Sequence, residues 1–591
     1  MLAVERAWRE GGRWLLLAVL AGALQMLAGA PEVILLTWVL LAALFAGEMV
    51  QASASRWRMS ARLVTVGLWV AGLAAAQLLP FLDLLTHSQR DKTFVSSMWS
   101  MPAWGWANFL VPLYRNYATP LGTYAQPDQY WIPSYYLGVG VISLALLAVG
   151  LVRRPFVWLL GVLTALCLLL TLGPHGLVYS ALGRVLPGLG FMRYPIKFVI
   201  LPTVLAPLLT ATFLAHCSRV IAVDWPRLRR RIVGLGFALL AIIALLIWSA
   251  FRFPLQGASA GVAAQSGAIR AGFLILILGG TVAWRQVRRQ PLERLARFAL
   301  LLLLWLDVLT AGPRPNPSVP RWVYGPDLAR KELHLDAAPQ VGDSRAMLNA
   351  EAERNLLVAP MTNGVNQVLY ARLAFYCNDN LLDHIPKVVG MYSLFLRESG
   401  DVLSTLFGAP QLPAGLADFL AVSHINTPNK VTEWEFRPNH LPWVTAGQKP
   451  VFADAAATLL ALAAPDFDPR RNVFLPPEAR AVVTVSNASP AKVSVQQFFP
   501  HKLQLEVQAP QAALVVIAQS FYHNWQAYVD DQPVRLLRAN HAFQAIEVSA
   551  GRHQVTLVYT DRMFYCGGLV SLFSTAIWVA FWLRGRKQPS A

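Results

Sequence analysis

The stretch IVGLGFALLAIIALLIWSA, residues Ile232–Ala250, contains no charged side chain. The core of a bilayer accommodates about 20 apolar residues of α-helix, so this stretch predicts a helix that crosses a membrane. Arg227 and Arg229–Arg231 stand directly before it, and such basic residues mark the cytoplasmic end of a membrane helix. The stretch therefore indicates both the class of protein and the side of the membrane on which this helix begins.

Nine further apolar stretches lie elsewhere in the chain. Hydrophobic residues make up 55% of the 591 residues and charged residues only 14%, which is too apolar for an ordinary soluble protein. We therefore expect a polytopic α-helical membrane protein with about ten transmembrane helices, a membrane domain over residues 1–312 and a C-terminal transmembrane helix over residues 563–583. The further stretches are Gly12–Ala28, Pro31–Ala46, Leu63–Leu79, Tyr135–Leu151, Val157–Leu172, Phe198–Ala215, Ala271–Ala283, Phe298–Leu309 and Tyr565–Leu583.

The net charge of +18 lies outside the one long water-compatible block. Pro313–Arg562 contains 21 Lys and Arg against 22 Asp and Glu, and the remainder contains 29 against 10. Most of this excess lies in alternate connections between the apolar stretches, as in cytoplasmic loops of membrane proteins. We expect both termini, including the tail 584–591, in the cytoplasm and the block outside a bacterial cytoplasmic (inner) membrane. A nucleic-acid partner is excluded, because its basic footprint would cluster on a soluble domain.

The extracytoplasmic block divides where the hydrophobic pattern changes. Residues 313–480 mix short apolar runs with turns and predict a mixed α/β region. Further on, Lys502–Val507 and His553–Tyr559 alternate polar and apolar residues, and Leu514–Ile517 is a continuous apolar run. Short strands of this kind predict a β-sandwich over residues 481–562, so the block is an α+β domain that ends in a sandwich.

Motifs of soluble enzymes are absent from the sequence: there is no glycine-rich phosphate loop, no Cys-x-x-Cys pair and no HExxH. Cys377 is the only cysteine of the outer block, which therefore has no internal disulfide. The outer loop 80–131 is rich in Trp and Tyr, which favour the membrane–water interface. It predicts one or two helices lying along the outer surface, or alternatively an aromatic belt at helix ends.

Three polar residues at the start of this loop are candidates for chemistry. Asp83, His87 and Arg90 stand four and three residues apart and would share one face of a helix. A carboxylate, an imidazole and a guanidinium there could bind a phosphate and assist a proton transfer; the alternative is a surface helix with solvated charges. A divalent metal ion is a conceivable cofactor, but no cluster of ligands in the sequence supports one, so no metal-binding residue is assigned.

Ionisable residues in or beside the apolar stretches are further candidates. Asp307 lies inside Phe298–Leu309, where a charge is costly unless it has a function or a partner such as an arginine or a backbone donor. Arg193 and Lys197 stand at the outer boundary, against the usual distribution of charge. An anionic lipid phosphate would account for them, as would ordinary snorkelling to the interface.

Short strings along the chain occur in a characteristic order: LQMLAGAPE (24–32), QLLPFLD (77–83), SQR (88–90), YYLG (135–138), FMRYPIKF (191–198), RPNHLP (437–442), NWQAYVD (524–530), ANHAF (539–543), GRHQV (551–555) and Tyr559. A chain with these strings and this topology resembles the bacterial YfhO-type membrane proteins, which are related to the GT-C glycosyltransferases. The resemblance covers nearly the whole chain.

The resemblance implies a GT-C-like fold and transfer of a sugar from a polyprenyl-phosphate-linked donor to a cell-envelope polymer on the outer face of the membrane. In GT-C enzymes an acidic residue in the first outer loop, after the first membrane helix, serves as base or metal ligand. The first stretch here is similar to a helix from the middle of a family member, so we expect a chain without the N-terminal helices, and that residue is not carried over. Asp83 and Asp307 are the candidates for a general acid or base or a metal ligand. The candidates for binding the phosphate are Arg90, Arg193 and Lys197.

A non-catalytic envelope accessory protein is the second hypothesis. Its outer domain would bind a glycan or a partner, and Trp525 and His541 could offer an aromatic and polar platform for a sugar. The alternative is that these side chains pack the core of the sandwich. A transporter would be favoured by inverted repeats, and we find no convincing repeat.

Overall fold

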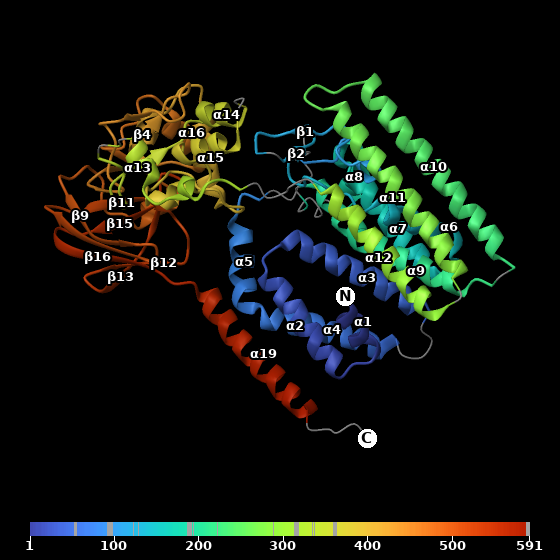
Figure 1. Ribbon diagram of the computed structural model, residues 1–591. Coiled ribbons are helices and arrows are strands. Elements are labelled where there is room, and N and C mark those ends of the chain that lie inside the picture. Colours follow the sequence, from blue (N-terminus) through green and yellow to red (C-terminus); the bar gives the residue numbers. More distant parts are fainter. Residues whose placement is uncertain are drawn as a thin grey trace. The chain divides into compact units, whose positions relative to one another are not determined.

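The computed structural model describes the chain apart from residues 52–55, 91–98, 122, 128, 186–191, 193, 222, 288, 313–317, 334, 336, 359–362 and 587–591. Contacts between residues divide it into two compact units (Figure 1). Unit 1 comprises Met1–Ala74, Asp91–Pro317 and Ser574–Ala591, and unit 2 comprises Ala75–Arg90 and Ser318–Phe573.

Unit 1 consists mainly of helices, and most of the apolar stretches of the sequence fall on them. A large apolar core joins α6, α7, α9, α10, α11 and α12, and a smaller one joins α1, α2 and α4. The helices are α1 (Leu2–Arg9), α2 (Arg13–Leu27), α3 (Pro31–Gln51), α4 (Arg56–Leu73), α6 (Val139–Leu151), α7 (Pro155–Leu170), α8 (Leu177–Val185), α9 (Ile200–Arg219), α10 (Trp225–Arg252), α11 (Ala260–Gln286) and α12 (Gln290–Ala311); α19 (Arg562–Arg586) begins in unit 2 and ends in unit 1.

Five helices of the described residues are long and apolar enough to cross a membrane: Pro31–Val50, Pro195–Arg219, Trp225–Arg252, Ala260–Gln286 and Arg562–Arg584. The bent pair of α4 and α5 (Ala75–His87) makes a sixth if it forms one span, and α2, α6 and α7 are shorter apolar helices. The prediction of a helical membrane protein with a β-rich domain is confirmed. The expected ten spans and the GT-C-like arrangement remain predictions.

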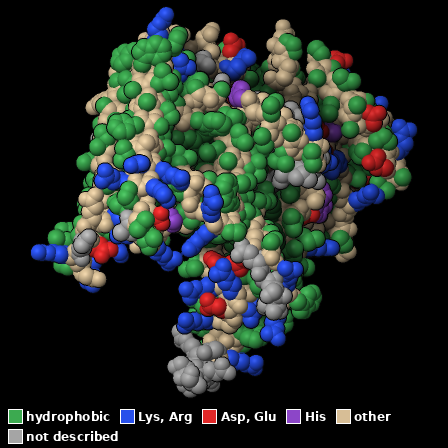
Figure 2. Space-filling view, turned by 90° about the vertical axis from the view of Figure 1, so that its right-hand side faces the viewer, with side chains coloured by type: hydrophobic (Ala, Val, Ile, Leu, Met, Phe, Trp, Pro, Cys, Tyr) green, Lys and Arg blue, Asp and Glu red, His purple; other side chains and the backbone are tan. Residues whose placement is uncertain are grey.

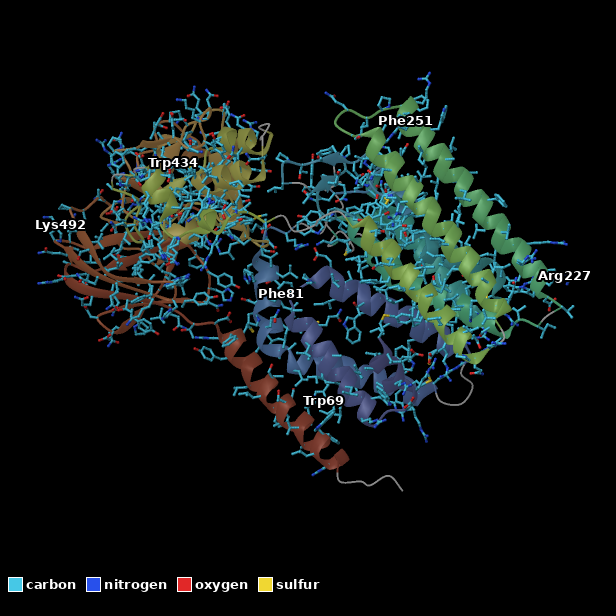
Figure 3. The ribbon with its side chains drawn as sticks, viewed as in Figure 1. Trp69, Phe81, Arg227, Phe251, Trp434 and Lys492 are labelled. Atoms are coloured by element: carbon cyan, nitrogen blue, oxygen red, sulfur yellow. The ribbon has the colours of Figure 1, made fainter. Side chains whose placement is uncertain are left out.

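Helix α10 shows why the apolar stretches indicate a membrane. Phe237, Leu245 and Trp248 are exposed large hydrophobic side chains, and Phe237 is 70% exposed. A helix of a water-soluble protein would turn such residues toward the core. Figure 3 places Arg227 near one end of this helix and Phe251 near the other, and Figure 2 shows hydrophobic side chains over much of the face that it draws.

Unit 2 contains a β-sandwich where the alternating pattern predicts strands. One sheet has the order β13-β12-β16-β10-β9 and the other the order β14-β15-β11-β6. Strand β6 comes from before residue 481, so the sandwich takes one strand from the region predicted to be mixed α/β. The strands are β6 (Val444–Ala446), β9 (Lys492–Phe499), β10 (Lys502–Ala509), β11 (Ala513–Ser520), β12 (Trp525–Val529), β13 (Gln532–Val534), β14 (Leu537–Ala539), β15 (Phe543–Val548) and β16 (Gly551–Tyr559).

The continuous apolar run of β11 is explained by burial on both of its faces. Val515 and Ile517 belong to the core between the two sheets. Leu514 and Val516 point the other way, into a second core that contains residues of the helices α16 to α18. Because side chains alternate along a strand, only a strand covered on both faces reads as uninterrupted hydrophobic sequence.

The remainder of unit 2 surrounds this second core with helices and two small sheets. One small sheet has the order β3-β4-β5, and β7 pairs with β8 in parallel. None of the four cysteines of the chain forms a disulfide, as the sequence predicts for the outer block. The elements are α13 (Leu328–Glu332), β3 (Arg345–Met347), α14 (Ala350–Val358), α15 (Gly364–Leu373), α16 (Arg397–Gly408), α17 (Ala414–Phe419), β4 (Val422–Asn426), β5 (Trp434–Phe436), β7 (Lys449–Phe452), α18 (Ala455–Ala463) and β8 (Asn472–Leu475).

Helix α5 belongs to unit 2 by its contacts, although the sequence places it with the first 312 residues. Gln89, just after the helix, exchanges two hydrogen bonds with the backbone of Phe395: its N–H donates to the carbonyl at 3.0 Å, and its Oε1 accepts from the N–H at 2.7 Å. At the other end the N–H of Ala76 donates to Oγ of Ser571 on α19 at 3.0 Å. These bonds fix α5 at both ends within unit 2.

The outer loop 80–131 differs from the expected interfacial helices. Within the residues described, it continues α5 to His87 and then contains a 3-10 turn, Gly105–Phe109, and the short hairpin of β1 (Tyr117–Ala118) and β2 (Tyr124–Ala125). Several aromatic side chains of this loop contact one another: the ring of Tyr130 packs against the rings of Trp99 and Tyr117. In the described part of the loop, packed aromatic side chains and a short hairpin stand where one or two interfacial helices were expected.

Candidate functional site

The site begins on helix α5, where Asp83 and His87 stand one turn apart; Figure 3 labels Phe81 of the same helix. The spacing of four residues puts both side chains on one face of the helix, as the sequence predicts. The turn that follows β11 brings Tyr522 and His523 to the same face. A hydrogen bond from the N–H of Trp525 to the carbonyl of Tyr522, 3.0 Å long, holds this turn.

The carboxylate of Asp83 is the centre of the cluster. The hydroxyl of Tyr522 donates a hydrogen bond to its Oδ2, and Nε2 of His523 lies 3.2 Å from the same oxygen. Nδ1 of His87 lies 3.7 Å from Oδ1. Burial raises the pKa of Tyr522, and the bond to Asp83 raises it further, so this hydroxyl stays protonated and remains a donor. The carboxylate of Asp83 is therefore surrounded by one phenol and two imidazoles.

The imidazole of His87 has a fixed tautomer. Its Nδ1 lies 2.9 Å from the backbone carbonyl oxygen of Asp83. A carbonyl oxygen can only accept, so Nδ1 donates in this contact, and in the neutral imidazole the lone pair is then on Nε2. The rings of His87 and His523 are 4.8 Å apart, and Tyr522 stacks on Tyr559. The aromatic contacts hold the imidazoles in place while leaving their edges accessible.

Asp83, His87 and His523 form a group whose ligand-type atoms all lie within 4.8 Å of one another. The sequence singled out Asp83 and His87 but not His523, which is more than 400 residues away along the chain. The one sequence feature that could have pointed to His523 is its position directly before the string NWQAYVD. Long-range contacts of this kind cannot be read from local spacing.

Arg90, the third residue of the predicted face, lies beyond the end of α5. It is partly buried, and its backbone N–H donates to Oγ of Ser88 at 3.3 Å. Ser88 also bridges to Leu396, so the chain has left the helix before Arg90 is reached. The structure therefore keeps Asp83 and His87 together and separates Arg90 from their helical face.

Of the two cations proposed for a lipid phosphate, Arg193 lies outside the described residues. Lys197 is placed in unit 1, where its Nζ is 3.2 Å from Oε1 of Glu32. The ammonium also lies over the rings of Trp131 and Tyr194, at 5.1 and 4.9 Å from their centroids. Its charge is thus already compensated by a carboxylate and two aromatic faces.

Asp307 is fully buried in unit 1 and paired with Arg270, itself only 1% exposed. Nη1 of Arg270 donates to Oδ1 of Asp307 at 2.7 Å, and the hydroxyl of Tyr136 donates to the same oxygen at 2.8 Å. The N–H of Gly140 adds a bond to Oδ2 at 3.3 Å. This geometry fits the structural alternative, a partner to an arginine, and leaves no accessible oxygen for a substrate.

The two residues proposed to bind glycan have different environments. Trp525 lies in the core between the two sheets, so its ring offers no face to a sugar. His541 lies in the tight turn between β14 and β15, where Asn540 and His541 both adopt positive φ. Its Nε2 is 3.0 Å from Oδ2 of Asp401, and it lines a cavity of about 690 Å³.

That cavity carries both polar and aromatic groups. Arg538 pairs with Glu398 at 2.5 Å and lies over the ring of Phe521, 4.9 Å from its centroid. Burial is the largest influence on Glu398 and raises its pKa. The hydrogen bond and the positive charge of Arg538, with a backbone hydrogen bond, together outweigh burial and lower the pKa below its ordinary value. The lining thus combines a fixed ion pair with an aromatic ring, which are groups that proteins use to bind polar ligands.

Residues 480–571 match the family model described as Bacterial membrane protein YfhO. The resemblance inferred from the sequence is thereby confirmed for residues 480–571. The match spans strands β9 to β16 and the start of α19, so it includes Tyr522, His523 and His541, whereas Asp83 precedes it. No curated protein and no solved structure matches the chain significantly.

Proposed function

We propose that this YfhO-family membrane protein is a GT-C-like glycosyltransferase. It transfers a sugar from a polyprenyl-phosphate-linked donor to a cell-envelope glycopolymer on the outer face of the bacterial cytoplasmic membrane. The observation that supports a catalytic role best is the position of Asp83, whose carboxylate is held by Tyr522 and His523 at the end of an apolar helix. The family match and the candidate spans support the membrane location.

In the proposed reaction, the oxygen of an acceptor hydroxyl forms a bond to the anomeric carbon of the donor sugar. The bond from that carbon to the phosphate oxygen breaks, and its electron pair leaves with polyprenyl phosphate. The proton of the acceptor hydroxyl passes to the carboxylate of Asp83, which acts as general base. The hydrogen bond from Tyr522 orients the carboxylate and leaves Oδ1 for the incoming proton.

Cationic side chains are proposed to stabilise the charge that develops on the phosphate. Arg90 is the candidate that lies in the same unit as Asp83. Arg193 and Lys197 are proposed as a separate contact for a lipid phosphate, which would have to compete with Glu32 for Lys197. Asp307 has no part in the proposed reaction, since its oxygens are occupied and buried.

A direct test compares the full-length protein with Asp83→Asn in proteoliposomes. The assay offers a panel of polyprenyl-phosphate-linked hexoses and isolated envelope polymer and measures polymer-bound radiolabelled sugar. Loss of a general base should lower the rate about 100-fold or more. Asp531→Asn makes the same chemical change at an exposed position of unit 2 and should leave the rate unchanged. Equal rates for Asp83→Asn and the wild type would remove Asp83 from the mechanism.

The second candidate function is that of an accessory protein that binds glycan in the cavity beside His541. The ion pair of Arg538 and Glu398 and the ring of Phe521 favour a polar, ring-shaped ligand there. His541→Ala should then weaken binding of envelope glycan, whereas His501→Ala, at an exposed site of the same sandwich, should not. Glycan binding that depends on His541, without transfer from any donor, would favour this function over the first.

A further inference from the structure

Asp83, His87 and His523 bring one carboxylate and two imidazoles together, with ligand-type atoms within 4.8 Å of one another. We propose that these residues bind a divalent transition-metal ion such as Zn²⁺, Mn²⁺ or Co²⁺. The proposal goes beyond the sugar transfer described above, because a cation could be held here whether or not the chain is a transferase. It is carried by the distances, the tautomer of His87 and the exposure of the site.

The distances between the candidate ligand atoms suit a shared ion. Two ligand atoms bound to one metal at about 2.1 Å lie about 3.0–3.4 Å apart at the usual coordination angles. Nε2 of His523 and Oδ2 of Asp83 are 3.2 Å apart. One ligand-type atom from each of the three residues lies within 4.8 Å of the other two.

The hydrogen bonds around the cluster resemble the outer shell of a metal site. His87 donates its Nδ1 proton to the carbonyl of Asp83, which leaves Nε2 free to bind. Metal-binding histidines usually donate their second nitrogen to a carbonyl or carboxylate in this way. Tyr522 donates to Asp83, as the partners of metal-binding carboxylates do. The orientation of two ligands is therefore set without the metal.

The elements that supply the ligands are fixed independently of one another. Asp83 and His87 come from α5, whose end is tied to unit 2 by the bonds between Gln89 and Phe395. His523 comes from the turn between two strands of the sandwich. Bonding outside the cluster thus brings the three groups together, so the site does not depend on the ion for its assembly.

The ligand set indicates the class of metal. Two imidazole nitrogens with one carboxylate suit zinc, manganese, iron or cobalt, whereas calcium and magnesium prefer oxygen ligands throughout. The side chains of His87 and His523 are 47% and 43% exposed, so water can reach the cluster. Three protein ligands and access to water are the features of a site that keeps an open coordination position.

The experiment measures cobalt binding by the full-length protein in detergent micelles, with any affinity tag removed and metal stripped by a chelator. One Co²⁺ per chain, with visible absorption bands that Zn²⁺ abolishes, is the expected result. His523→Asn and His87→Gln should each weaken binding at least 10-fold. His501→Asn, at an exposed position of the same sandwich, should bind cobalt like the wild type. No saturable binding below 1 mM Co²⁺, or equal affinity in all variants, would overturn the proposal.

A second measurement avoids dependence on the folding of the variants. Diethylpyrocarbonate modifies accessible imidazoles, and Zn²⁺ should protect His87 and His523 of the wild-type protein but not His501, as read by mass spectrometry. Unprotected His523 would also overturn the proposal. The outcomes separate the two proposals: transfer without bound metal rejects only the metal site, and cobalt binding without transfer rejects only the transferase.

Discussion

The buried pair of Asp307 and Arg270 shows what a single residue can and cannot reveal in a sequence. A charge inside an apolar stretch must have a partner or a function, and the sequence presented both options. The partner, Arg270, lies 37 residues away on α11 and was not among the candidates, because the contact depends on how helices pack. The same limit applies to Asp83, whose partners Tyr522 and His523 come from the other end of the chain.

We predict that Asp307→Leu destabilises the protein strongly. Breaking a buried ion pair leaves an uncompensated charge, which typically costs about 3–5 kcal/mol of folding free energy. The double variant Asp307→Leu with Arg270→Met removes both charges and should recover much of that loss. The thermal unfolding midpoint in detergent reports the effect. If the double variant is no more stable than Asp307→Leu, the unpaired charge of Arg270 is not the cause of the instability.

A second residue-scale prediction concerns Lys387, which lines a cavity of about 470 Å³ in unit 2. Its Nζ donates to the carbonyls of Phe375 and Cys377, both at 2.7 Å, and both of these residues have positive φ. Burial lowers the pKa of Lys387 to about 8, because the charged form loses hydration. Below that pH the amine is protonated and unreactive, and above it the neutral amine is a nucleophile.

Labelling of Lys387 by trace acetic anhydride should therefore rise with a midpoint near pH 8. Mass spectrometry of peptides from the full-length protein measures the rate at each pH. Exposed Lys492, on β9 and labelled in Figure 3, shows that the reagent is active throughout the series. A midpoint near the ordinary lysine value of 10.5 would mean that Lys387 is solvated and not buried.

At the scale of elements, periodicity predicted the types of structure well and their ends poorly. Strand β10 alternates buried and partly buried residues as its sequence indicates, and β11 is buried on both faces. The apolar stretch Leu63–Leu79 instead divides at Ala74 into α4 and α5. Nothing in its composition marks the break, which coincides with the point where Ala76 donates to Ser571 of α19. The N–H of Ala76, at the start of α5, is thus satisfied by a hydroxyl from the far end of the chain and not by a carbonyl of the preceding helix.

The close approach of α19 to the start of α5 gives a prediction at this scale. A Cβ on Gly567 would lie 2.3 Å from the carbonyl oxygen of Ala75, so only glycine fits at this crossing. Gly567→Ala should displace α5 and lower the midpoint of thermal unfolding. Gly568→Ala is the matched control: its Cβ meets nothing within 4 Å, and alanine favours the helix by up to about 1 kcal/mol. Equal effects of the two substitutions would exclude a close contact.

At the scale of the whole molecule, the distribution of charge is the property that can be determined most directly from the sequence. It gave an expected orientation from the arginine-rich connections alone, without reference to any contact. Contacts, by comparison, assign α5 to unit 2 and give the sandwich a strand from before residue 481. The charge of a loop is obtained by counting residues in the sequence. The boundaries of the two units depend on contacts between distant segments, so they cannot be predicted without a structure.

The expected orientation can be tested with single cysteines in a cysteine-free background. Ser486, exposed in unit 2, should lie outside the cytoplasmic membrane, and Asp224, exposed at the basic end of α10, should lie inside. A membrane-impermeant maleimide should therefore label Ser486→Cys in intact spheroplasts and Asp224→Cys only after permeabilisation. The reverse pattern would put unit 2 in the cytoplasm, where Asp83 could not act on a polymer of the cell envelope. Labelling of both from outside would mean that the number of spans before α10 is not the one predicted.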